Sequence, residues 1–162
     1  MDTTPNDIIS TRNAFHEGVR RCLAEVAEVG CRELLLSDVD FADWPLGERA
    51  VIDSLTAWAQ SHRRLTLLAA TFDEVPRRHA RFAEWRRTWA HVVDCRANDE
   101  LEPGEMPSML LAPGLLGLRL VDPIRYRGSI TRDAADLLRW RDALNAVLER
   151  AQPAFPATTL GL

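Results

Sequence analysis

Apolar residues in the first quarter of the chain follow first the period of an α-helix and then the pattern of a buried strand. Between residues 15 and 29 they are spaced four, three, four and three apart, which predicts one buried helix face (Phe15, Val19, Cys22, Val26 and Val29). Ser10 or Thr11 can cap the start of this helix, and Gly30 is expected to end it. The segment 32–39 contains three consecutive leucines, which predict a strand buried on both faces.

The rest of the chain continues this alternation. Further helices are expected over 47–61, 73–90 and 131–151, and further strands over 65–71, 92–95, 109–112, 116–121 and 124–126. Strands alternating with helices predict a single α/β domain, with a mostly parallel or mixed sheet and helices on both faces.

The boundaries of this domain are expected near the two ends of the sequence. We assign the domain to residues 11–152, with a disordered polar leader over 1–10. Residues 153–162 are apolar, and we expect this tail to dock, because leaving Phe155, Leu160 and Leu162 in water is unfavourable. The sequence leaves open whether the tail docks on its own domain or on a partner subunit.

Composition and charge narrow the chemistry. All twenty basic residues are arginine, which excludes any mechanism that needs a lysine. The net charge of −4 argues against binding nucleic acid, and we expect no nucleic-acid partner. No apolar run reaches about 18 residues, so we expect no membrane association. The three cysteines lack a paired spacing and predict free thiols in a reducing cytoplasm, with no metal site.

One stretch carries a recognisable motif. Residues 115–122 end in Asp122 and are followed by Gly128 and Ser129, an order that resembles the H-x-K-x(4)-D and Gly-Ser signature of the phospholipase D superfamily. Leu115 stands at the position of that family's histidine and Gly117 at that of its lysine. Neither residue can act as a nucleophile or hold a phosphate oxygen.

The resemblance implies the fold of one phospholipase D-like half without its catalytic pair. Members of that family usually join two such halves, so it also implies a homodimer or a non-catalytic module that binds a small anionic ligand or a protein partner. We assign no catalytic residue and no cofactor, and Asp122 and Ser129 are candidate binding residues.

A second candidate site follows the first expected strand. Asp38 and Asp40 lie where open α/β sheets place their ligands, and the D-x-D pattern resembles the haloacid dehalogenase phosphatases. Arg77, Arg78 and Arg81 cluster at the start of the helix expected over 73–90 and could bind a phosphate or carboxylate. An alternative function is therefore a small phosphatase-like or other hydrolytic enzyme built on these five residues.

A third hypothesis concerns the strand and helix over residues 34–58. Their order resembles the STAS domains of anti-sigma antagonists, which place a phosphorylatable serine at the start of that helix. Here the nearest serine, Ser54, is in the middle of the expected helix. This alternative would make the chain a regulatory interaction domain.

Overall fold

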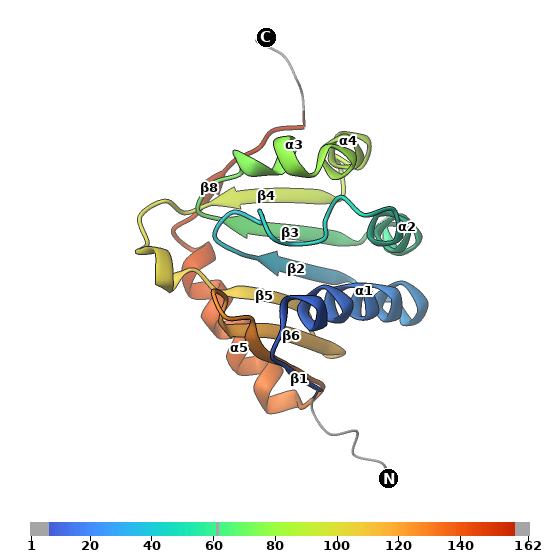
Figure 1. Ribbon diagram of the computed structural model, residues 1–162. Helices are drawn as coiled ribbons and strands as arrows, with labels where there is room; N and C mark the ends of the chain where they lie inside the picture. Colours follow the sequence, from blue (N-terminus) through green and yellow to red (C-terminus); the bar gives the residue numbers. More distant parts are fainter. Residues whose placement is uncertain (1–6, 61, 158–162) are drawn as a thin grey trace.

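The computed structural model describes residues 7–60 and 62–157, which form a single α/β domain around one mixed sheet (Figure 1). The sheet has eight strands in the order β1-β7-β6-β5-β2-β3-β4-β8. The strands are β1 (Asp7–Ile9), β2 (Glu33–Ser37), β3 (Arg64–Ala69), β4 (Val93–Ala97), β5 (Ser108–Ala112), β6 (Leu116–Asp122), β7 (Arg127–Thr131) and β8 (Gln152–Pro153). Strands β2, β3 and β4 are parallel, and each of the other pairings is antiparallel.

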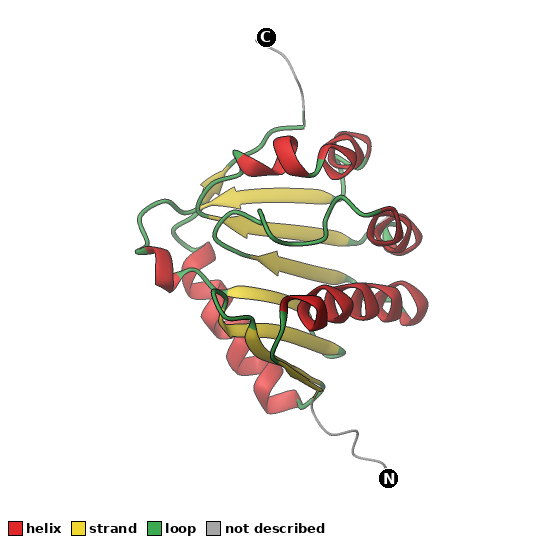
Figure 2. Ribbon diagram, viewed as in Figure 1, coloured by secondary structure: helices red, strands yellow, loops and turns green. Residues whose placement is uncertain are grey.

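Helices cover both faces of this sheet, as expected (Figure 2). The helices are α1 (Arg12–Val29), α2 (Arg49–Trp58), α3 (Glu74–Arg78), α4 (Ala80–Thr88) and α5 (Ala134–Leu148). The first four pack on one face, and α5 packs on the other. The leucine run of β2 serves both faces, because Leu34 and Leu36 join the first core while Leu35 joins the second.

The cap and stop signals at the first helix are confirmed, whereas Val29, expected on its buried face, is exposed. The side chain of Thr11 accepts a hydrogen bond from the backbone N–H of Ala14, and Gly30 ends α1 with a φ of 88°. Positive φ is accessible to glycine because it has no Cβ. Helix α1 lies beside α2.

Among the residues that the structure describes, no helix is long and apolar enough to cross a membrane.

Three expectations about elements are corrected. Residues 124–126, expected as a strand, form a turn between β6 and β7. The helix expected over 73–90 is interrupted at His79, whose φ and ψ are −130° and 56°. Residues 7–9, expected within a disordered leader, form strand β1 on the edge of the sheet, where they pair with β7.

The apolar tail contacts its own domain as far as the structure describes it. The backbone N–H of Ala154 donates to the carbonyl oxygen of Cys95, and Arg86 donates to that of Phe155. The ring of Phe155 stacks on that of Phe72, with ring centroids 5.7 Å apart. Residues 158–162, which the tail was expected to include, lie outside the described residues.

Candidate functional site

The loop that follows β2 is held by a buried carboxylate. Asp38 is 8% exposed, and its Oδ2 accepts hydrogen bonds from the backbone N–H of Phe41 (2.9 Å) and of Asp40 (3.3 Å). Its Oδ1 accepts from the hydroxyl of Ser108 on β5 (2.8 Å). Burial raises the pKa of Asp38, and these hydrogen bonds act against that rise. The carboxylate thus fixes Phe41 in its positive φ of 59°.

Two histidines hold the same loop from opposite sides. His16 on α1 contacts the carbonyl oxygen of Asp43 through Nε2 at 2.6 Å, and His79 contacts that of Phe41 through Nε2 at 2.7 Å. A carbonyl oxygen only accepts, so each histidine donates through Nε2. The bond from His79 also accounts for the interrupted helix, because the ring reaches Phe41 from the junction between α3 and α4.

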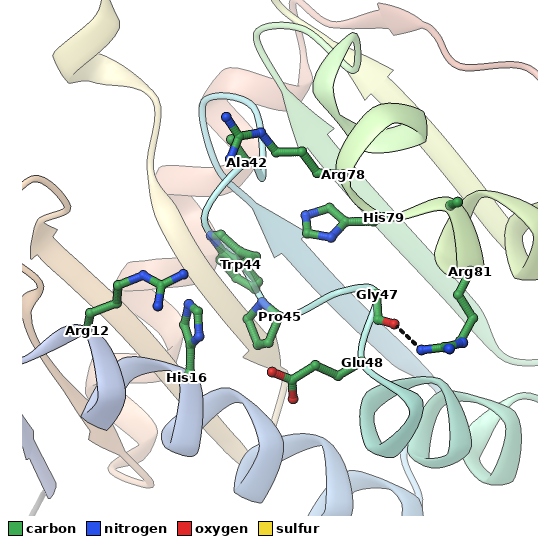
Figure 3. A pocket seen from close by; sticks show the side chains of 11 residues that line it. Arg12, His16, Ala42, Trp44, Pro45, Gly47, Glu48, Arg78, His79 and Arg81 are labelled. Carbon is green, nitrogen blue, oxygen red and sulfur yellow. Dashed lines mark hydrogen bonds between the residues drawn. The ribbon is translucent and has the colours of Figure 1, made fainter.

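Beside this loop lies an open pocket of about 780 Å³, which we call the arginine pocket (Figure 3). Its lining residues come from α1, from the loop after β2 and from the junction of α3 with α4: Arg12, His16, Ala42, Trp44, Pro45, Gly47, Glu48, Arg78, His79, Ala80 and Arg81. Figure 3 shows Arg12 and His16 on one side of the Trp44–Pro45 segment and the α3–α4 residues on the other. Three guanidinium groups from separate elements therefore border one hollow.

These arginines have exposed, exchangeable partners. Arg12 pairs with Asp43 at 2.9 Å and Arg78 with Glu74 at 2.9 Å, while Arg81 donates to the carbonyl oxygen of Gly47 at 2.7 Å. The side chains of Arg12 and Arg78 are 55% and 59% exposed, and ion pairs this open contribute only about 0–1 kcal/mol. A phosphate could therefore replace these partners at small cost.

The single carboxylate in the lining is already engaged. Both oxygens of Glu48 accept from Arg20, at 2.9 and 3.0 Å. Glu74 lies outside the lining, and its hydrogen bonds from Arg78 and then Arg77 lower the pKa of that carboxyl. The pocket lining therefore has three arginines and one carboxylate, on a chain whose net charge is −4.

The expected binding residues are divided among different places. Arg78 and Arg81 line the arginine pocket, but Arg77 only pairs with Glu74 at the exposed surface. Asp38 and Asp40 line a second, smaller cavity of about 170 Å³. The hypothesis of a hydrolytic enzyme requires the two aspartates and the arginines to lie in one pocket. The structure does not bring them together.

The residues of the phospholipase D-like motif do not form a site. Asp122 ends β6, where it accepts from the side chain and backbone of Arg125 in an exposed turn. Ser129 lies within the sheet, opposite Arg119 on β6. Gly117, at the position of the family's lysine, lies under α5, and a Cβ there would be 2.9 Å from Trp140 Cε3. No lysine side chain would fit at that position.

Several residues of the arginine pocket were missed by the sequence analysis. Arg12 and His16 are four residues apart, which places them on one face of α1, but nothing in the sequence indicates what this face meets. His79 and Glu48 gave no recognisable spacing. Their convergence depends on the tertiary arrangement of α1, α2 and the α3–α4 junction.

Comparisons with known proteins give a fold but no family. No protein-family model matches the chain, and no curated protein matches it. Among solved structures it is similar to TrmBL2, an archaeal chromatin protein whose structure shows a novel mode of DNA binding. The TM-score is 0.64 at 16% sequence identity, over 94% of this chain and 56% of TrmBL2. The chain thus spans little more than half the length of that protein.

This likeness corrects the functional hypotheses drawn from the sequence. The matched fold is that of TrmBL2 and not of a phospholipase D-like domain, so that resemblance is wrong, and the homodimer inferred from it loses its basis. The phosphatase and STAS alternatives gain no support. The exclusion of nucleic acid from net charge is also wrong, because TrmBL2, which contains this fold over 56% of its length, binds DNA.

Proposed function

We propose that this chain is a DNA-binding protein that holds the phosphate backbone at the arginine pocket. The observation that carries the proposal is the convergence of Arg12, Arg78 and Arg81 around one open hollow. Guanidinium groups suit phosphate, because their planar N–H donors can bind two oxygens at once. A DNA ligand implies that the protein works in a compartment that contains DNA.

The fold supports the same ligand. TrmBL2 binds DNA, and this chain resembles over half of it. The likeness alone does not say which part of TrmBL2 contacts DNA, so the assignment of the contact to the arginine pocket depends on this chain's own residues.

The net negative charge limits how this binding can work. A chain of charge −4 has no overall attraction for a polyanion, so affinity must come from a few local contacts. Three arginines provide such contacts. Contacts to the phosphate backbone of DNA do not distinguish one base sequence from another. We therefore expect weak binding that depends little on sequence.

Binding can be tested by fluorescence anisotropy with a short labelled DNA duplex at low salt. Arg12→Ala, Arg78→Ala and Arg81→Ala should each weaken binding, because each removes one phosphate contact. Arg150→Ala is the matched control, since it removes the same charge from an exposed residue just after α5, on the other face of the sheet. Equal losses in all four variants would contradict the pocket as the contact site, and no measurable binding by the wild type would contradict the function.

A further inference from the structure

The second cavity lies between the loop after β2 and the turn that joins β6 to β7, and we call it the aspartate cavity. It has a volume of about 170 Å³, and Trp44 and Ala42 line both it and the arginine pocket. Its charged and aromatic lining residues are Asp38, Asp40, Asp43, Phe15, Trp44 and Tyr126. None of its lining residues is basic, so its chemistry is opposite to that of the neighbouring pocket.

Two of these carboxylates have no cationic partner within residues 7–60 and 62–157. Asp43 pairs with Arg12, but neither Asp38 nor Asp40 makes a salt bridge there. Asp38 accepts its hydrogen bonds from neutral donors alone, a hydroxyl and two backbone amides. A buried carboxylate whose charge is not balanced costs free energy, and a cation beside it would offset that cost.

A buried hydrogen-bond donor faces the same region without a partner. The side chain of Trp44 is buried, and its indole N–H makes no hydrogen bond. Every other buried side-chain nitrogen and oxygen of the described residues has a hydrogen-bond partner. Burial is the largest effect on the pKa of Asp38 and raises it. The indole of Trp44 lies close enough to this carboxyl to lower its pKa, as the weakest of several groups that do so. A buried donor left unpaired costs free energy, which an acceptor on a ligand would recover.

The aromatic lining favours a cation over a neutral ligand. The ring of Phe15 meets that of Trp44 edge-on, with centroids 5.4 Å apart, and lies 6.1 Å from that of Tyr126. Aromatic faces attract organic ammonium groups, most strongly where water is excluded. No group of three His, Cys, Asp or Glu side chains in the described residues is placed to hold a metal ion. The aromatic lining instead favours an organic ammonium ion.

We propose that the aspartate cavity binds a small organic ammonium ion that also carries an oxygen acceptor. The ammonium group donates to the carboxylates of Asp38 and Asp40 and lies against the aromatic rings, while the oxygen accepts from the indole N–H of Trp44. The cavity volume of about 170 Å³ limits the ligand to a small molecule. The proposed ligand contacts differ from the three arginines proposed to hold DNA, so the two proposals are tested separately.

Ethanolamine is the probe, because it joins one ammonium group to one hydroxyl. The chain has five tryptophans, and each indole N–H contributes one signal to a ¹H–¹⁵N spectrum, so Trp44→Phe identifies the signal of Trp44 by its loss. Ethanolamine should move that signal saturably. Propylamine, which has no oxygen, should leave it in place, and ethylene glycol, which has no charge, should not bind.

Variants separate the site from non-specific binding. Asp38→Asn and Asp40→Asn should each weaken ethanolamine binding by about tenfold or more. The control Asp53→Asn, an exposed aspartate on α2, should not change it. The proposal is overturned if ethanolamine gives no saturable shift, if ethylene glycol or propylamine moves the Trp44 signal equally, or if both cavity variants bind like the wild type.

Discussion

Removing the carboxylate of Asp38 should release the loop that separates the two cavities. In Asp38→Ala, the hydroxyl of Ser108 and the backbone N–H of Phe41 lose the oxygens that accept from them at 2.8 and 2.9 Å. Each stranded buried donor costs about 1–3 kcal/mol, so the free energy of unfolding should fall by about 2–6 kcal/mol.

Asp38→Asn distinguishes the loss of hydrogen-bond acceptors from the loss of the negative charge. The amide oxygen can accept from Phe41 while the amide nitrogen donates to the hydroxyl of Ser108, which can also accept. The asparagine variant should therefore lose much less stability than the alanine variant.

Thermal unfolding followed by circular dichroism measures both variants. For a domain of this size about 1 kcal/mol corresponds to about 2–4 °C, so Asp38→Ala should lower Tm by at least about 4 °C. Equal melting of Asp38→Ala, Asp38→Asn and the wild type would refute the role of the carboxylate in holding the loop.

The remaining predictions concern the fold and its titrating groups. Gly128→Ala should cost about 3 kcal/mol or more in urea unfolding, because its Cβ would lie 1.9 Å from a backbone oxygen of β6; Gly104→Ala, with nothing within 4 Å, should change little. Burial raises the pKa of Cys22 and Cys95 to about 12, so at about pH 8 only about one thiol in ten thousand is ionised. Iodoacetamide followed by peptide mapping should leave both unmodified in the folded protein, and modification as fast as in urea would contradict this. Burial also raises the pKa of Asp38, so its proton binds more tightly in the folded state. The wild type should therefore gain stability over Asp38→Asn as the pH falls through that raised pKa, reach the full gain below the unfolded pKa, and lose it again as the pH rises.

Local sequence signals predicted those parts of the fold that local chemistry decides. The cap at Thr11, the stop at Gly30 and the burial of Phe15, Val19, Cys22 and Val26 all lie within one element, and the structure confirms them. Val29, expected on the same buried face, is exposed. The leucine run of β2 predicted burial on both faces because only a covered central strand can hide three consecutive apolar side chains.

Errors arose where a distant partner decides the backbone conformation. Gly128 and Ser129 were assigned to a binding motif, but the backbone of β6 passes so close to Gly128 that only glycine fits the strand pairing there. The helix expected over 73–90 stops at His79 because its ring bonds to Phe41, 38 residues earlier in the chain. Neither contact can be recognised from local spacing.

The candidate site was predictable only in fragments. Asp38 and Asp40 were located because polar residues after a buried strand often face a ligand, and Arg78 and Arg81 because they cluster. The division of these residues between two cavities depends on Trp44, which separates them and gave no signal beyond its place in a turn.

The dependence of DNA affinity on salt tests the central claim most directly. Each phosphate neutralised contributes about −0.9 to the slope of log affinity against log salt, so three arginines predict about −2.7. Between about 50 and 200 mM salt, the wild type should lose about 40-fold in affinity. The triple variant Arg12→Ala, Arg78→Ala, Arg81→Ala should retain almost no slope, whereas an unchanged slope in that variant would contradict binding at the arginine pocket.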